Sequence, residues 1–129
     1  MKIAHIAIWV KDLERTRVFY EKYFNARSNA LYINKKTMFK SYFLSFDNAS
    51  RLELMQMPTV QESSKTKVDQ VTGFNHLAIS VGSKEEVIRL TNRLANDGYE
   101  VLKDPRYTGD GYYESLVLDP EKNRIEITV

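Results

Sequence analysis

The chain of 129 residues has no cysteine, which excludes disulfides, thiolate metal ligands and a cysteine nucleophile. It also lacks an apolar run of about 18 residues that would span a bilayer, and its first residues lack the apolar core of a signal peptide. Neither charge sign dominates, since 19 basic residues balance 17 acidic ones, and no clustered basic reader motif for nucleic acid is present. We therefore expect a cytoplasmic protein without nucleic-acid or membrane partners.

Histidine is scarce as well, and its two occurrences lie in a repeated segment. The sequence IAHIAIWV at residues 3–10 is nearly copied as FNHLAISV at residues 74–81. Alternate side chains of a strand share a face, so His5 and His76 each share the less apolar face of a predicted strand with the alanine that follows two positions later. The opposite face of both strands is apolar and is expected to be covered.

A second repeat places a glutamate late in each half. RLEL at residues 51–54 corresponds to RIEI at residues 124–127. Each predicted strand again has one apolar face, and Glu53 and Glu126 lie on the other. The sequence therefore contains two equivalent His and Glu pairs, and the simplest arrangement turns the faces that bear them toward a shared cavity.

Both halves predict the same order of elements, a strand, a helix and three strands. The first helix follows the N-cap Asp12 and ends near residue 24, and the second lies between a capping box at Ser83 and Glu86 and a C-cap at Gly98. The remaining strands are predicted at residues 29–34, 39–46, 51–57, 99–103, 112–118 and 124–129. A polar linker at residues 58–73 separates modules at residues 1–57 and 74–129.

Four segments together resemble the vicinal oxygen chelate superfamily, which includes glyoxalase I, bleomycin resistance proteins and extradiol dioxygenases. They are HIAIWVKDLERTRVFYEKYF from His5, RLELM around Glu53, HLAISV from His76 and the C-terminal GDGYYESLVLDPEKNRIEITV. The resemblance, closest to the glyoxalase I-like branch, implies an α+β fold in which two βαβββ modules form one domain with an open, cupped mixed sheet.

The resemblance also implies one divalent metal ion, with His5, Glu53, His76 and Glu126 as its ligands. Two imidazoles and two carboxylates suit zinc, nickel, cobalt, manganese or ferrous iron, and the sequence does not choose among them. The implied activity is that of a lyase or isomerase that acts on a small α-oxygenated carbonyl compound through a metal-chelated enediolate. Glu126 is then the first choice for the base, with Glu53 handling the proton on the opposite side.

Five residues are predicted to contact the substrate: Trp9, Met55, Met57, Tyr113 and Arg106. Bacterial glyoxalase I has an arginine at the position of Trp9 and an asparagine at that of Met57, and both contact glutathione there. These departures argue against glutathione hemithioacetal as the substrate. Two other functions stay open within the resemblance, namely binding of a drug or small molecule without catalysis, and an extradiol dioxygenase that uses ferrous iron.

The duplicated plan also predicts a homodimer. In this superfamily the metal site commonly forms where modules of two chains meet. His5 and Glu53 of one chain would then face His76 and Glu126 of the other, or all four ligands would come from one chain.

Overall fold

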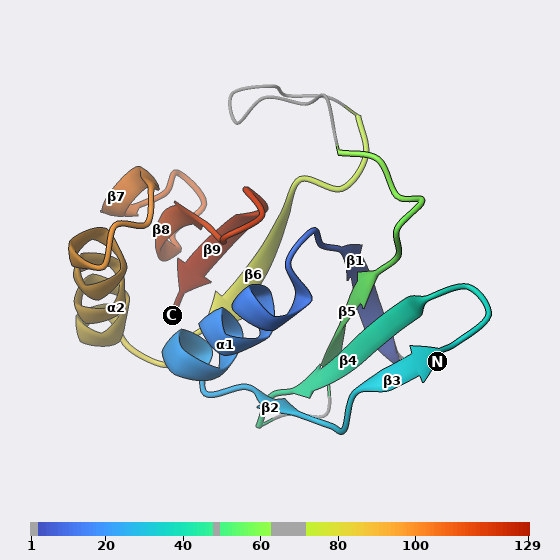
Figure 1. Ribbon diagram of the computed structural model, residues 1–129. Helices are drawn as coiled ribbons and strands as arrows, with labels where there is room; N and C mark the ends of the chain where they lie inside the picture. The colour runs from blue at the N-terminus through green and yellow to red at the C-terminus, as the bar shows by residue number, and fades with distance from the viewer. Residues whose placement is uncertain (1–2, 48–49, 63–71) are drawn as a thin grey trace. The chain divides into compact units, whose positions relative to one another are not determined.

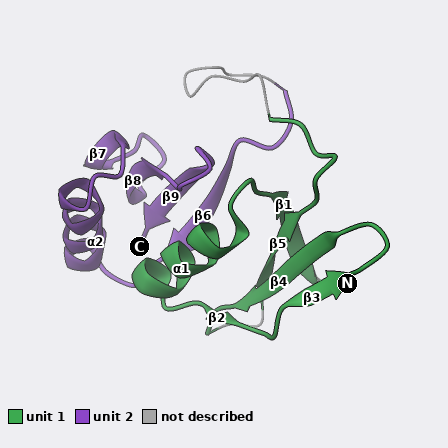
Figure 2. Ribbon diagram, viewed as in Figure 1, with its two compact units in different colours: residues 1–64 green, residues 65–129 purple. Residues whose placement is uncertain are grey.

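The computed structural model describes residues 3–47, 50–62 and 72–129. The chain divides into two compact units, Met1–Ser64 and Lys65–Val129 (Figure 2). Among the described residues, each unit contains one helix and one mixed sheet, so the α+β class predicted from the sequence is confirmed. Residues 63–71 of the predicted linker lie outside the described ranges. No helix in the described part of the chain is long and apolar enough to cross a membrane.

Unit 1 is built on a sheet with the strand order β1-β5-β4-β2, and β3 also pairs with β4. Its elements are β1 (His5–Trp9), α1 (Leu13–Phe24), β2 (Arg27–Ser28), β3 (Tyr32–Asn34), β4 (Phe39–Ser45) and β5 (Arg51–Gln56). β1 runs parallel to β5, and the other pairs are antiparallel. The helix lies against one face of this sheet (Figure 1), where Leu44, Leu52 and Leu54 are buried.

The strand predicted at residues 29–34 is wrong in its start, because only its last part forms a strand, β3, and a separate short strand, β2, precedes the predicted range. Asn29 lies between them and contacts Phe43 twice: its backbone N–H donates to the Phe43 carbonyl (3.1 Å), and its side-chain oxygen accepts from the Phe43 N–H (2.8 Å). An asparagine side chain that competes for backbone groups in this way interrupts the regular ladder.

The first helix begins and ends where the sequence predicts. Asp12 accepts a hydrogen bond from the backbone N–H of Arg15 (3.0 Å), and Asn25 ends the helix with a left-handed backbone (φ 53°). The aromatic residues Phe19 and Tyr20 are almost completely buried beneath it. Their spacing provides the apolar stripe that holds the helix on the sheet.

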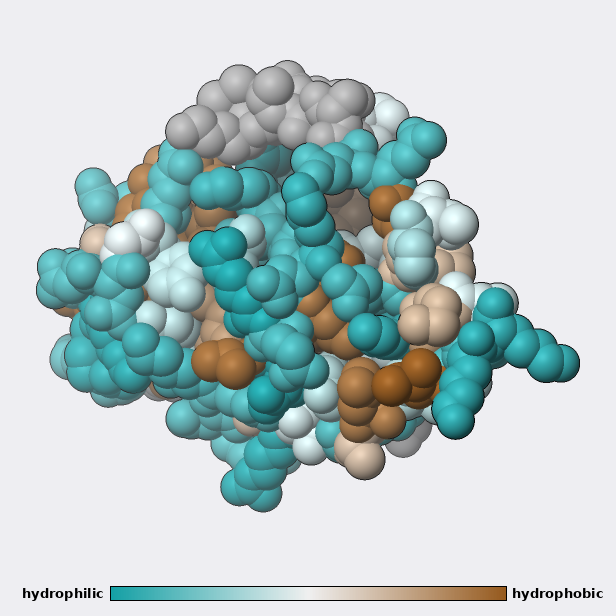
Figure 3. Space-filling view, viewed as in Figure 1, coloured by the Kyte–Doolittle hydropathy of each residue, from teal (hydrophilic) through white to brown (hydrophobic). Residues whose placement is uncertain are grey.

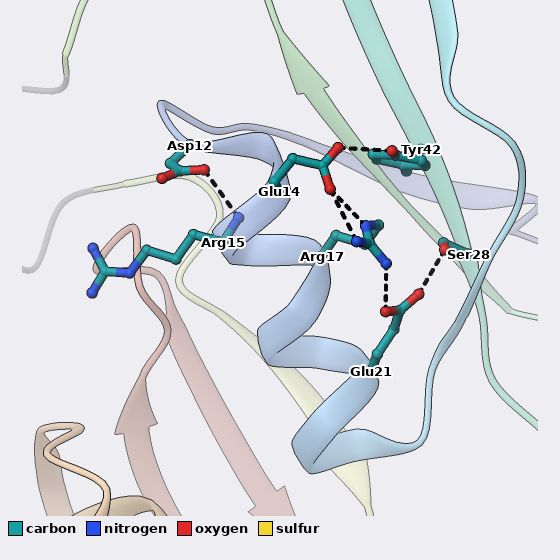
Figure 4. Close-up of polar contacts among 7 residues, drawn as sticks. All are labelled: Asp12, Glu14, Arg15, Arg17, Glu21, Ser28 and Tyr42. Carbon is teal, nitrogen blue, oxygen red and sulfur yellow. Dashed lines mark hydrogen bonds and ion pairs between the residues drawn. The ribbon is translucent and has the colours of Figure 1, made fainter.

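Polar contacts on α1 join it to the neighbouring strands (Figure 4). Tyr42 donates a hydrogen bond to Glu14 (2.7 Å), and Arg17 forms an ion pair with Glu21 (2.6 Å). The Ser28 hydroxyl donates to the same Glu21 carboxylate (2.6 Å), and this hydrogen bond lowers the pKa of Glu21, to which the Arg17 guanidinium also contributes. These contacts fix the helix relative to β2 and β4.

Unit 2 repeats the plan with the strand order β6-β9-β8-β7. Its elements are β6 (His76–Ser80), α2 (Lys84–Asn96), β7 (Val101–Tyr107), β8 (Tyr113–Leu118) and β9 (Arg124–Thr128). The prediction for residues 99–103 was wrong, because β7 begins later and continues through Pro105. Proline is tolerated there because β7 is an edge strand with irregular register toward β8.

Helix α2 also follows its predicted signals. The Ser83 hydroxyl accepts from the Glu86 backbone N–H (3.2 Å), and Gly98 adopts the left-handed conformation expected after a helix (φ 87°). The Glu86 carboxylate forms an ion pair with Arg89 (2.6 Å). The buried side of the helix carries Val87, Leu90, Thr91 and Leu94.

Apolar residues are concentrated in these two cores, and charged residues make up 28% of the sequence. Figure 3 accordingly shows a mostly hydrophilic visible face with separate hydrophobic patches. Isolated exposed apolar residues are normal on a protein surface, whereas a contiguous group next to polar side chains indicates a binding site.

Candidate metal and substrate site

The first His and Glu pair lies on the sheet face of unit 1 that is opposite to α1. His5 Nε2 and Glu53 Oε2 are 3.7 Å apart, and the strand register sets Ala7 directly beside Glu53. The small alanine side chain leaves room for the imidazole to approach the carboxylate. The His5 ring is held by an edge-to-face contact with Phe43 at a centroid distance of 5.2 Å.

Unit 2 repeats this arrangement on the face of its sheet opposite to α2. His76 Nε2 and Glu126 Oε2 are 3.3 Å apart, and the register sets Ala78 directly beside Glu126. His76 Nδ1 lies 3.0 Å from the side-chain oxygen of Asn75. When Nδ1 carries the proton and donates it to Asn75, the lone pair of Nε2 is available for a metal ion.

The distances within both pairs fit ligands of a metal ion. Two donors that each lie about 2.1 Å from an ion are separated by about 3.0 Å in octahedral geometry and about 3.4 Å in tetrahedral geometry. The observed 3.3 Å and 3.7 Å require only small adjustments. Within residues 3–47, 50–62 and 72–129, no group of three or more His, Asp or Glu side chains gathers as a metal site.

A second carboxylate stands beside Glu126, and sequence reasoning missed it. Glu114 on β8 is paired in register with Thr128 and forms an ion pair with Arg106 of β7 (Nη2 to Oε1, 3.0 Å). Burial raises the pKa of Glu126, and the charge and hydrogen bond of Glu114 raise it further, whereas His76 acts in the opposite direction. The alternation of side chains along β8 could have identified Glu114. Leu116 is the register partner of Glu126, and Glu114, two residues before Leu116, therefore points to the same face of the sheet.

The other predicted substrate residues are not all on these faces. Trp9 and Met55 are register partners on the His5 face, and Arg106 contacts Glu114. Met57 lies beyond the end of β5, where its carbonyl accepts from the Val60 N–H (3.1 Å).

Tyr113 lies on the opposite side of the unit 2 sheet. It alternates with Glu114 and therefore shares a face with Ser115, whose hydroxyl contacts Thr91 of α2. Its ring packs against Tyr107 at a centroid distance of 5.0 Å, and the Lys84 ammonium lies 5.8 Å from its centre. The structure thus places Tyr113 beside α2 and does not bring it together with His76 and Glu126.

The glyoxalase/bleomycin resistance protein/dioxygenase superfamily model matches residues 2–127 of the chain. The chain therefore belongs to this superfamily, whose members share the vicinal oxygen chelate fold. It is 28% identical over 131 residues to the uncharacterized protein YqjT of Bacillus subtilis, and the match covers 95% of this chain and 94% of that protein.

Solved structures show the same fold. Glyoxalase I from Zea mays superposes with a TM-score of 0.80 at 22% identity, over 98% of this chain and 44% of the maize chain. The chain thus spans less than half of that enzyme. A glyoxalase family protein from Enterococcus faecalis superposes with a TM-score of 0.78 at 22% identity, over 99% of this chain and 97% of that chain.

Proposed function

We propose that the protein is a metal-dependent lyase or isomerase of the glyoxalase I type that acts on a small α-oxygenated carbonyl compound. In this proposal His5, Glu53, His76 and Glu126 hold one divalent ion. The observation that carries the proposal is the matched pairing in the two units. In each, an imidazole nitrogen lies 3.7 Å or 3.3 Å from a carboxylate oxygen, and the His and the Glu occupy corresponding register positions in the two sheets.

The protein's own groups account for the proton transfer. A divalent ion held by these ligands supplies Lewis-acid stabilisation of the negative charge that develops on a substrate oxygen. Glu126 would remove the proton from the adjacent carbon as the general base. Glu53, on the corresponding strand of the other unit, returns a proton to the substrate from the side opposite to Glu126.

Arg106 provides a contact for an anionic group of the substrate. Its Nη2 is bound by Glu114, whereas Nη1 is buried and has no hydrogen-bond partner among the described residues. A buried N–H without a partner costs about 1–3 kcal/mol, and a carboxylate oxygen of the substrate would satisfy it. Glu114 holds the guanidinium in place on the sheet face that also carries Glu126.

Exchange of a carbon-bound proton with solvent tests the proposed reaction. Metal-loaded protein is incubated in deuterated water with a panel of α-hydroxy and α-keto carbonyl compounds, and deuterium incorporation is followed by NMR. We expect incorporation by the wild type and a loss on the order of 100-fold or more in Glu126→Gln. The variant's metal content is measured alongside, so that loss of the base is separated from loss of the ion.

The same preparation distinguishes the other functions of the superfamily. A protein that binds small molecules without metal or exchange is a sequestering protein. Bound iron with oxygen consumption indicates a dioxygenase. Either outcome would replace the proposed lyase or isomerase activity.

Assembly as a cytoplasmic homodimer completes the proposal. The two donor pairs of one ion then come from one chain or from two chains. Light scattering of the metal-loaded protein tests the arrangement with two chains, because a strictly monomeric species that retains the ion excludes ligands from two chains.

A further inference from the structure

The two sheets carry different residues at one pair of corresponding positions across their strands. These positions lie two residues beyond Glu53 on β5 and two residues beyond Glu126 on β9. We call the residues at these positions the outer row. In unit 1 the outer row consists of Trp9, Met55, Ser41 and Tyr32. In unit 2 the corresponding residues are Ser80, Thr128, Glu114 and Arg106. Because the same pairing accommodates either set, the fold does not require the apolar residues of unit 1.

Two of the four outer-row residues of unit 1, Trp9 and Tyr32, are aromatic and exposed, whereas Ser41 is buried. The exposed fractions of Trp9 and Tyr32 are 43% and 53%. The Phe39 ring contacts both, edge-to-face with Trp9 at 6.0 Å and tilted against Tyr32 at 6.1 Å. Aromatic rings in such arrangements present edges and faces that receive another ring favourably.

This aromatic surface continues directly from the proposed metal ligands. Met55 follows Glu53 by two residues on the same face of β5, a separation of about 7 Å along a strand. Phe43, on the same face of β4, contacts the His5 ring. A substrate held at His5 and Glu53 therefore extends onto the outer row without leaving this sheet face.

We propose that the outer row of unit 1, together with Phe39, binds a planar aromatic group of the substrate. The substrate class is then an aromatic α-oxygenated carbonyl compound. The assignment of its reactive end depends on the function proposed above, whereas the binding of the ring depends only on unit 1 and does not need the metal ion.

Trp9 is the only tryptophan of the chain, so its fluorescence reports on this surface directly. The metal-free full chain is titrated with mandelate and with lactate, which share an α-hydroxy acid and differ in a phenyl or methyl group. We expect a saturable fluorescence change with mandelate and an affinity about 10-fold or more higher than that for lactate, because only mandelate buries a ring on the outer row.

Two variants test the assignment while the tryptophan is kept. Met55→Thr installs the residue that unit 2 has at this level, and Tyr32→Ser removes an exposed ring without opening the core. Each is expected to weaken mandelate binding roughly 5-fold or more and to leave lactate binding unchanged. Ile88→Thr, at an exposed position of α2, is the matched control and is expected to bind both compounds as the wild type does. Circular dichroism verifies that all three variants are folded.

The outcomes separate this inference from the proposed function. Ring binding by the metal-free protein, followed by no proton exchange after metal loading, supports the aromatic surface and contradicts the enzyme activity. Equal binding of mandelate and lactate, or unchanged mandelate binding in both variants, overturns the inference. A Trp9 signal that changes with protein concentration alone also overturns it, because the surface is then an interface between copies of the chain.

Discussion

At the residue scale, the environment of Glu126 predicts how the stability of the metal-free protein depends on pH. Burial and the neighbouring Glu114 raise the pKa of Glu126. A carboxyl group whose pKa is raised by folding contributes stability below its unfolded pKa and loses that contribution as pH rises through the folded pKa. The ionised Glu126 therefore destabilises the metal-free protein at neutral pH.

Glu126→Gln imitates the protonated form at every pH. Urea unfolding in the presence of EDTA is expected to give similar free energies for the variant and the wild type near pH 4, and a more stable variant near pH 7. A variant that is less stable than the wild type at pH 7 would show that His76 outweighs burial and Glu114.

The residue scale is also where the sequence was least informative. The repeat pointed to His5, Glu53, His76 and Glu126 because a histidine and a glutamate recur at corresponding positions of the two halves. The position of unit 1 that corresponds to Glu114 is occupied by Ser41. Comparison of the two halves therefore did not identify Glu114. A residue that differs between the two modules cannot be found from their repeat. The proximity of Glu114 to Glu126 follows only from the pairing of β8 with β9.

At the element scale, the hydroxyl groups between α2 and β8 form a buried contact that fixes the helix on its sheet. Thr91 Oγ1 donates to the Val87 carbonyl (2.6 Å) and lies 2.6 Å from Ser115 Oγ. Thr91→Val removes the hydroxyl group that Ser115 contacts and leaves the buried Ser115 hydroxyl without that hydrogen bond. We expect the free energy of unfolding to fall by about 1–3 kcal/mol.

Ser115→Ala is the matched comparison, because Thr91 then keeps its bond to Val87. Its expected cost is about 0.5–1.5 kcal/mol, measured by urea unfolding at neutral pH. A Ser115→Ala variant that is less stable than Thr91→Val would contradict the assigned direction of these hydrogen bonds.

Helices were easier to predict than strands for a physical reason. The caps at Asp12 and Ser83 are local, since each side chain binds a backbone N–H three residues later. Strand limits depend on the partner strand, as the interruption at Asn29 shows through its bonds to Phe43. The face of Tyr113 likewise became clear only from the position of α2.

At the scale of the whole molecule, a duplicated fold carries two different surfaces. Both units place an imidazole and a carboxylate at corresponding register positions, while the outer row contains two aromatic residues in unit 1 and an ion pair in unit 2. In the proposed function the matched pairs bind one ion, and in the further proposal the outer row of unit 1 binds the aromatic group of the substrate.

Metal content tests the central claim, that the two His and Glu pairs serve one ion. The wild type, His5→Ala and His76→Ala are purified without chelators and analysed for metal per chain, with circular dichroism as the control for folding. We predict about one ion per chain in the wild type and a large loss in both variants, because each variant removes one ligand of the same ion. Equal metal in His76→Ala and the wild type, or two ions per chain each lost separately, would contradict the account.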